Sequence, residues 1–278
     1  MESYTLFGNS AATATAAPTQ LVHTPRALSA RIIAVEALYP ETREAMWRLF
    51  CRYYTEVGRE IFFSDLAQKS HVILIRERVD HEVKGFSTIQ TYDAEVDGRR
   101  VAVLFSGDTI VDREYWGQTA LQRAFLRFII QYKLSHPLTP VYWFLISKGY
   151  KTYLLLSRNF PTYWPRHDRE TPPWEQALIH KLAGEKFGDT YVPADGVLRF
   201  ETCPCRLKQG VAPIDDQLRA RYPEVRFFEQ KNPGHSDGDE LCCIGLINPT
   251  LWISYLAKLG WRKARKARKA LRGAGGPR

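Results

Sequence analysis

The sequence predicts an α/β protein in which a mixed central sheet carries helices on both faces, with an insertion before the last pair of strands. Short apolar runs that suit buried strands alternate with segments whose apolar residues recur at helical spacing. The dipeptide Asp97-Gly98 joins two strand-like runs in the manner of a tight hairpin. The 278 residues are 45% hydrophobic, which is enough to bury a sizeable core.

The first part of the chain predicts an arm, a strand and two helices. Residues 1–25 are rich in Ala, Thr and Ser without periodicity, so we expect a disordered arm. Residues 31–38 suit a buried strand, and Pro40 opens a helix. The apolar residues of that helix follow a helical spacing: Met46, Leu49, Phe50, Tyr53 and Val57. Residues 59–69 predict a second, shorter helix.

Residues 71–160 complete a predicted core that spans residues 26–160. Strands are expected at 71–75, 85–96 and 99–105, and the last of these continues to Val111. A helix follows Gly117 and ends at Pro137, with one apolar face formed by Leu121, Ala124, Phe125, Phe128 and Tyr132. A strand at 141–146 and a helix at 153–158 close the order β-α-α-β-β-β-α-β-α.

The remaining chain predicts an insertion, a final strand pair and a basic tail. Residues 161–222 form the insertion, with helices near 173–187 and 214–221 and a strand near 197–201. Four of its residues are large aromatics: Trp164, Trp174, Phe187 and Tyr191. Residues 225–230 and 240–247 are expected to form the last antiparallel pair, within a segment spanning 223–250. Asn248-Pro249 predicts the start of a C-terminal helix, which leads into the tail within 251–278.

Charge and cysteine content narrow the function classes. The net charge is +9, and eight basic residues with no acid lie between Arg262 and Arg278, which leaves +1 for residues 1–261. The five cysteines lack the spacing of a zinc site, so we expect reduced thiols and no metal. The N-terminus does not resemble a signal peptide and no apolar run is long enough to span a membrane, which predicts a cytoplasmic protein. The chain carries no G-x-S-x-G, P-loop or G-x-G-x-x-G motif.

One segment carries a family resemblance. Residues 111–121, VDREYWGQTAL, are similar to the stretch V-x-P-E-Y-R-G-K-G-I-G of the Gcn5-related N-acetyltransferase (GNAT) superfamily. The segment lies where that family has it, after the fourth strand and at the start of the third helix. Four residues match: Val111, Glu114, Tyr115 and Gly117. Trp116 stands in place of a usual Arg or Gln, and Thr119 and Leu121 replace the later glycines. The element order over residues 28–160 and 224–247 also resembles this family.

The resemblance implies an N-acyltransferase, in which an amine attacks the thioester of acyl-CoA or of an acyl carrier protein. The donor would bind where a strand enters a helix through a tight turn, because the unpaired N–H groups of the helix start attract phosphate. The residues implied at this site are Ile110, Val111, Trp116, Gly117, Gln118, Thr119 and Ala120. An ordinary strand-to-helix turn is the alternative. The missing glycines are compatible with a carrier-protein donor or a long acyl chain.

The resemblance also suggests catalytic residues. Asp108 lies on the fourth strand where members of the family carry an acid that accepts the amine proton, and the alternative is a turn or bulge residue after Gly107. Tyr150 and Tyr153 follow the fifth strand and could protonate the leaving thiolate, although the usual family Tyr aligns nearer Leu155. Each Tyr also suits packing in the core.

The acceptor and the tail leave alternatives open. The acceptor would be an amine of a small molecule, an amino acid or a peptide, including Lys or ornithine side chains. The aromatic insertion at 161–222 would form part of the acyl or acceptor pocket. The basic tail could act as a nucleic-acid arm. It also follows an apolar segment, so it could bind an anionic membrane surface or an acidic carrier protein. Its basic pairs recur every three residues and spread around a helix, which disfavours readout of nucleic-acid bases. A non-catalytic carrier-binding protein of the same fold is a further alternative.

Overall fold

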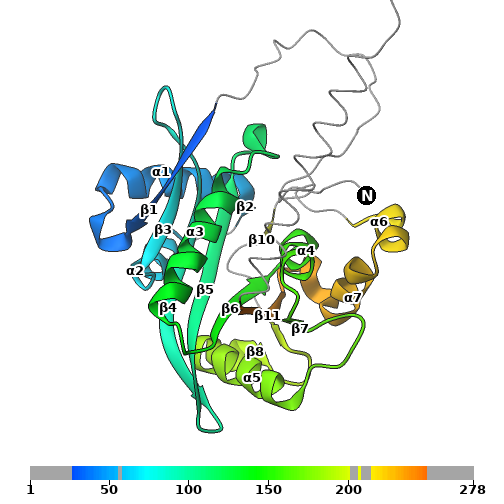
Figure 1. Ribbon diagram of the computed structural model, residues 1–278. Helices are drawn as coiled ribbons and strands as arrows, with labels where there is room; N and C mark the ends of the chain where they lie inside the picture. Colours follow the sequence, from blue (N-terminus) through cyan, green and yellow to red (C-terminus); the bar gives the residue numbers. More distant parts are fainter. Residues whose placement is uncertain (1–26, 56–57, 201–205, 208–213, 249–278) are drawn as a thin grey trace, which may run out of the picture.

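A twisted sheet organises the protein (Figure 1). The structure is a computed structural model that describes residues 27–55, 58–200, 206–207 and 214–248. The sheet has nine strands in the order β1-β3-β4-β5-β6-β11-β9-β8, with β7 also paired to β11. Its strands are β1 (Leu28–Ala34), β3 (His71–Glu77), β4 (Val83–Val96), β5 (Arg99–Val111), β6 (Val141–Ser147), β7 (Tyr163–Trp164), β8 (Tyr191–Val192), β9 (Val197–Leu198) and β11 (Glu240–Ile247). A separate small sheet pairs β2 (Tyr54–Thr55) with β10 (Arg206–Leu207).

Helices cover both faces of the sheet, which confirms the predicted mixed α/β architecture. The α-helices are α1 (Pro40–Tyr53), α2 (Arg59–Ala67), α3 (Ala120–Ser135), α4 (Tyr150–Asn159), α5 (Pro173–Phe187), α6 (Asp216–Arg221) and α7 (Pro223–Lys231). The 3-10 helices are η1 (Val35–Ala37), η2 (Arg113–Tyr115), η3 (Gly188–Thr190) and η4 (Pro233–Ser236). Helices α1, α2 and α5 pack on one face, and α3, α4 and α7 pack on the other (Figure 1).

Strand periodicity explains why both faces of the sheet carry a hydrophobic core. Alternate residues of β5 point to opposite faces of the sheet. Val101, Val103 and Phe105 join the core beneath α5, whereas Ala102 and Leu104 join the core beneath α3 and α4. All five are at most 2% exposed, so the central strand is apolar on both faces and reads as a continuous hydrophobic run.

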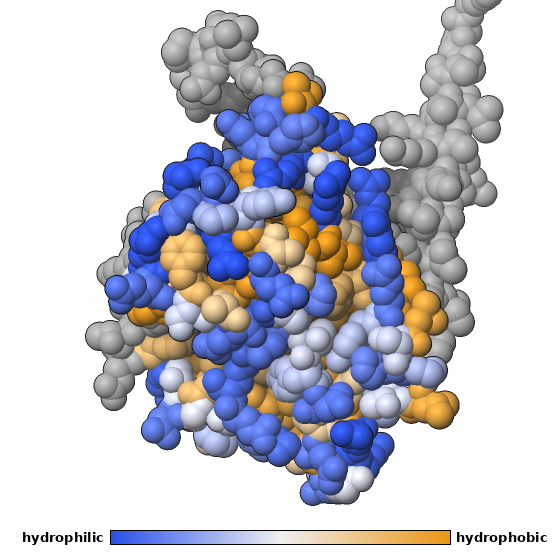
Figure 2. Space-filling view, turned by 90° about the vertical axis from the view of Figure 1, so that its left-hand side faces the viewer, coloured by the Kyte–Doolittle hydropathy of each residue, from blue (hydrophilic) through white to orange (hydrophobic). Residues whose placement is uncertain are grey.

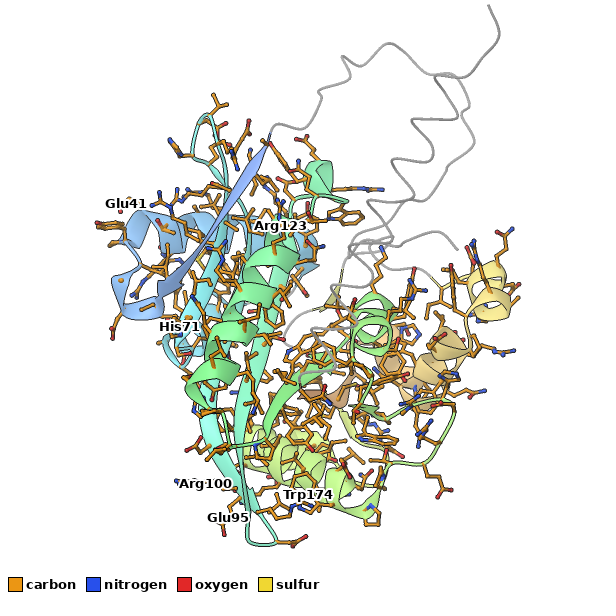
Figure 3. All side chains as sticks on the ribbon, viewed as in Figure 1. Glu41, His71, Glu95, Arg100, Arg123 and Trp174 are labelled. Carbon is orange, nitrogen blue, oxygen red and sulfur yellow. The ribbon has the colours of Figure 1, made fainter. Side chains whose placement is uncertain are left out.

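The β4–β5 hairpin forms as the sequence predicts. Asp97 and Gly98 take φ values of 50° and 72°, the positive values that this tight turn requires. The turn reaches the start of α5, where Trp174 lies beside it (Figure 3). The Trp174 indole N–H donates to the carbonyl of Val96 at 3.4 Å, and the Arg99 guanidinium lies 4.4 Å from the centre of the indole ring. The hairpin is therefore tied to the insertion.

The predicted strand pair at 225–230 and 240–247 is half wrong. Residues 240–247 form β11, but residues 225–230 belong to helix α7. Pro223 occupies the first turn of α7, where its fixed φ suits a helix, and the buried residues Val225 and Phe228 are three apart on one helical face. The missing strand partner comes from the insertion, since β7 and β9 pair with the outer edge of β11.

The face of the molecule shown in Figure 2 is largely polar. The side formed by β1, α1 and α2 shows hydrophilic residues with apolar ones between them (Figure 2). Among the described residues, no helix combines the length and apolar character that crossing a membrane requires. The predicted N-terminal arm and the predicted helix and tail at 251–278 lie outside the described residues.

Close packing of α4 on β11 generates a stability prediction. A Cβ at Gly245 would lie 2.7 Å from Leu156 Cδ1 and 2.8 Å from Phe160 Cδ1. Gly245→Ala should therefore lower the free energy of unfolding by about 1–3 kcal/mol, because the helix has to move away from the sheet. Denaturant unfolding measures this change.

The matched control is Gly184→Ala in α5, where a Cβ would meet nothing within 4 Å. That variant should be more stable than the wild type by about 0.5–1 kcal/mol, since alanine favours the helix. Equal effects of the two substitutions would contradict the packing described here.

Candidate active site

The two central strands separate in the middle of the sheet. Strands β5 and β6 run parallel and pair from Ala102–Val141 to Ser106–Leu145. Beyond Ser106, β5 continues for five residues to Val111, whereas β6 ends at Ser147 and leads into α4 (Figure 1). The edge of β5 that faces β6 therefore has no strand partner over residues 107–111 in the described part of the chain.

A β-bulge lies where the strands separate. Ile89 pairs with Ser106 and Ser87 pairs with Thr109, so Gly107 and Asp108 together oppose Thr88. A Cβ at Gly107 would lie 2.6 Å from Thr88 Oγ1 and 3.0 Å from Lys69 Cε, so glycine is needed for this close approach. Of the two sequence-based alternatives for Asp108, the bulge is observed, and a role in catalysis is compatible with it.

Asp108 lies among charged side chains from distant parts of the chain. Two ion pairs surround it. Lys69 and Asp65, at the end of α2, lie 2.5 Å apart, and Lys148 and Glu240, next to the ends of β6 and β11, lie 3.3 Å apart. Burial, reinforced by Asp65 and Glu240, raises the pKa of Asp108 from 3.8 to about 7, although Lys69 and Lys148 oppose the shift. Asp108 itself makes no ion pair within 4 Å among the described residues.

The turn after β5 has the predicted form. η2 follows β5, Gly117 takes a φ of 90°, and α3 begins at Ala120. The first backbone hydrogen bond of α3 runs from Arg123 N to Thr119 O at 3.1 Å, so the preceding N–H groups have no partner within the helix. Two bonds fix the turn. The Tyr115 hydroxyl donates to Glu77 Oε2 at 2.6 Å, and the Trp116 indole donates to the Val111 carbonyl at 2.8 Å.

Two cationic groups lie beside this turn. The Lys151 ammonium lies 4.9 Å from the centre of the Trp116 ring, and the Arg113 guanidinium lies 5.6 Å from it. Burial and the charge of Arg113 lower the pKa of Lys151. The start of α3 and these two cations together form an electropositive site suited to phosphate.

The other residues predicted at the donor site differ in accessibility. Ile110, Val111 and Ala120 are buried in the core, so their backbone rather than their side chains would face a ligand. Gln118 and Thr119 are half-buried at the start of α3. The turn therefore offers mainly backbone groups, as binding at a helix start requires.

The two predicted tyrosines lie on α4 and pack into the core. Tyr153 is fully buried, its hydroxyl donates to the carbonyl of Pro165 at 3.0 Å, and its ring stacks on Phe227 with centroids 6.0 Å apart. Burial raises the pKa of Tyr153 far above its ordinary value. These contacts are those of a packing residue. Tyr150 is 8% exposed. It is the first residue of α4, which begins just after the end of β6, so it borders the region where β6 leaves β5.

A separate cleft of about 630 Å³ lies at the outer edge of β11. Neither Asp108 nor the turn before α3 contributes to its lining. Its walls come from the insertion, α5, α7 and β11, and they include these charged residues: Arg166, Asp168, Arg169, Glu170, Asp195 and Lys231. Arg166 is already bound to Asp168, with contacts of 2.6 and 2.7 Å. The same walls also hold apolar side chains, among them Ile179, Phe227 and Leu241.

Sequence reasoning missed the charged residues that surround Asp108. No local spacing in the sequence links these residues. Lys69 follows α2, Lys148 follows β6, and Glu240 begins β11. Only the sheet order, which brings β5, β6 and β11 together, places them near one another. Among the described residues, His, Cys, Asp and Glu side chains form no group of three that could hold a metal ion.

The raised pKa of Asp108 predicts a pH-dependent stability. The folded carboxyl keeps its proton up to pH about 7, whereas the unfolded one loses it near the ordinary value of 3.8. The folded state therefore binds more protons in this window, and its stability falls as pH rises from about 4 to about 7. Asp108→Asn removes this component, so the variant should gain stability relative to the wild type as pH increases. Urea unfolding at pH 4.5, 6 and 8 measures the difference, and a difference that is constant with pH would contradict it.

Comparisons with known proteins show similarity in fold to acyltransferases. No protein-family model matches the sequence, and no curated protein matches it. An Enterococcus faecalis protein named as a probable N-acyltransferase is 13% identical with a TM-score of 0.36, over 46% of this chain and 32% of that one. The chain thus spans about a third of that protein's length.

Two Escherichia coli proteins are also similar. The GNAT-family N-acetyltransferase YhbS, solved with CoA, is 15% identical with a TM-score of 0.35, over 50% of this chain and 71% of that one. ElaA is 16% identical with a TM-score of 0.34, over 53% of this chain and 95% of that one. At these values the likeness concerns the arrangement of part of the chain.

Proposed function

We propose that this protein transfers an acyl group from a CoA-type thioester to an amine. The observation that carries the proposal is the separation of β5 from β6, which lies between an electropositive helix start and a carboxylate of raised pKa. The separation supplies a slot for a thin donor arm, the helix start supplies a phosphate site, and the carboxylate supplies a proton acceptor. Acyl transfer to an amine uses all three.

The donor would lie along the free edge of β5. A pantetheine arm contains amides that can pair with the unpaired edge of a strand, as an added strand does. Its pyrophosphate would sit at the start of α3 near Arg113 and Lys151. A carrier protein presents the same arm through one phosphate, so it remains the alternative donor. The cleft at β11 lies away from Asp108 and the turn before α3, so it gives no support for a long acyl chain at this site.

The chemistry follows from the placement of Asp108. The amine nitrogen attacks the thioester carbonyl, and the N–H groups on the free edge of β5 would stabilise the oxyanion. Asp108 accepts the proton that the nitrogen loses as the C–N bond forms. Collapse of the intermediate breaks the C–S bond, and the departing thiolate takes up a proton to leave as a thiol. No covalent enzyme intermediate is needed.

The basic tail belongs to this proposal as a binding element. Residues 262–278 lie outside the described residues, so their role rests on charge alone. A tail of eight basic residues would raise the local concentration of an anionic partner, either a membrane surface or an acidic carrier protein. The salt dependence of such binding would distinguish it from binding at the site.

Replacement of Asp108 tests the catalytic role. Asp108→Asn should lower the turnover of acyl-CoA and amine by roughly 10²–10⁴-fold, because the amide cannot accept the proton. The wild-type rate should rise as pH increases through about 7, where the carboxyl ionises, and the variant should lose this dependence. Release of free thiol measures turnover, and circular dichroism checks the fold.

The matched control is Asp93→Asn on β4, where the carboxylate is half exposed and lies 3.8 Å from Arg100 near the hairpin. It should leave turnover unchanged. Normal turnover of Asp108→Asn would assign the proton to an ordered water instead. Donor binding without any thiol release from the wild type would favour a non-catalytic carrier-binding protein.

Replacement of Gly117 tests the donor site. Gly117→Val forces a branched residue into a φ of 90° and crowds the start of α3, so donor affinity should fall by at least about tenfold while acceptor affinity is kept. Calorimetric titration with CoA measures this. Gly98→Val places the same strain in the distant hairpin, where φ is 72°, and should leave CoA affinity unchanged. An unchanged dissociation constant for Gly117→Val would remove this turn from the donor site.

A further inference from the structure

The Phe105 ring, on the sheet face covered by α2 and α5, has two ammonium groups beside it. Lys186 Nζ, from the last turn of α5, lies 4.5 Å from the ring centre, and Lys69 Nζ lies 5.5 Å from it. Phe105 precedes the bulge at Gly107 and Asp108 on the same strand. Lys69 also lies against this bulge, because a Cβ at Gly107, the residue before Asp108, would be 3.0 Å from Lys69 Cε. Its charge accordingly acts on the pKa values of both Asp108 and Lys186. Asp108 and Lys186 therefore belong to one charged cluster.

Within this cluster, two ionisable groups lack a charged partner. Lys69 is paired with Asp65, and Lys148 is paired with Glu240. Among the described residues, neither Asp108 nor Lys186 has an oppositely charged group within 4 Å. The cluster thus leaves one carboxyl and one ammonium without a counterion.

The environment of Lys186 favours an anion. Its ammonium donates to the neutral side-chain amide of Gln90 at 2.6 Å, and its side chain is half-buried. Burial and the nearby charge of Lys69 lower the pKa of Lys186 to about 8. An anion placed against Lys186 would restore the lost solvation of the ammonium and oppose the repulsion from Lys69.

We propose that the acceptor is an amino acid or a similar compound, whose carboxylate pairs with Lys186 while its amine faces Asp108. This deepens the proposed function and rests on it for the role of Asp108. Bound as its zwitterion, the acceptor would supply the counterion that each of the two groups lacks, and its ammonium group would release a proton to solvent before the free amine attacks. A single negative charge matches the single unpaired ammonium, so a carboxylate fits better than a phosphate, which carries nearly two charges at neutral pH.

The test compares acceptors that differ only in the anionic group. Free amino acids and their carboxamides share the amine and the side chain, and glycine, alanine and phenylalanine with their amides make a suitable panel. Binding is measured by calorimetry with full-length protein in the absence of donor, and thiol release is measured with acetyl-CoA. The wild type should bind at least one acid about tenfold or more tightly than its amide, as expected for a charge-assisted hydrogen bond.

Variants assign this preference to Lys186. Lys186→Met keeps the length of the side chain and removes its charge, so the preference should disappear through weaker binding of the acid alone. Lys186→Arg should keep it. Lys181→Met, on the same helix, removes an ammonium already paired with Glu185 at 2.5 Å and should change nothing.

The outcomes separate this inference from the proposed function. Equal binding of acid and amide, or no binding of either, overturns the inference whether or not other amines are acylated. A preference that survives Lys186→Met in a folded variant also overturns it. Preferential binding of the acid that is lost in Lys186→Met supports the inference, even if no thiol is released. The absence of thiol release would count against acyl transfer and not against the inference. Because the acid–amide comparison uses the wild type, a poorly folded variant does not prevent a decision.

Discussion

The end of the β5–β6 pairing at Ser106 and Leu145 is the constraint on which the proposed site depends. Parallel strands that stayed paired would leave no free edge on β5 and no space for a donor arm. The bulge at Gly107 and Asp108 bends β5 at the same level, and the two strands then diverge toward α3 and α4. The buried Trp143 indole, which donates to Ser106 Oγ at 2.8 Å, fixes the last paired position.

The divergence would give the two proposed substrates separate approaches. The proposed phosphate site lies at the start of α3, at the end of β5, while Asp108 lies near the end of α2 on the opposite face of the sheet. Donor and acceptor would then meet only at the free edge of β5. Such an arrangement suits direct transfer, because the amine and the thioester reach one point without sharing a pocket.

Electrostatics in the charged cluster around Asp108 and Lys186 depends on burial more than on net charge. Lysines and carboxylates are nearly balanced there, yet burial raises the pKa of Asp108 and lowers that of Lys186. Both shifts reduce the charge of the two unpaired groups near neutral pH. A ligand that pairs with them would reverse the shifts and gain affinity from doing so.

The sequence by itself determined most of the longer elements, and the tertiary structure decided which residues share a site. Local patterns sufficed for the hairpin at Asp97-Gly98, for α5 and for the glycine turn before α3, since each depends on neighbours a few residues away. The helix at 223–231 was missed, because its short apolar pattern fits a strand equally well until Val225 and Phe228 are seen buried together. Asp108 was a candidate from its position on the fourth strand. The two ion pairs and Lys186 around it could not be found, because they join residues up to 175 positions apart (65 to 240) through sheet order alone.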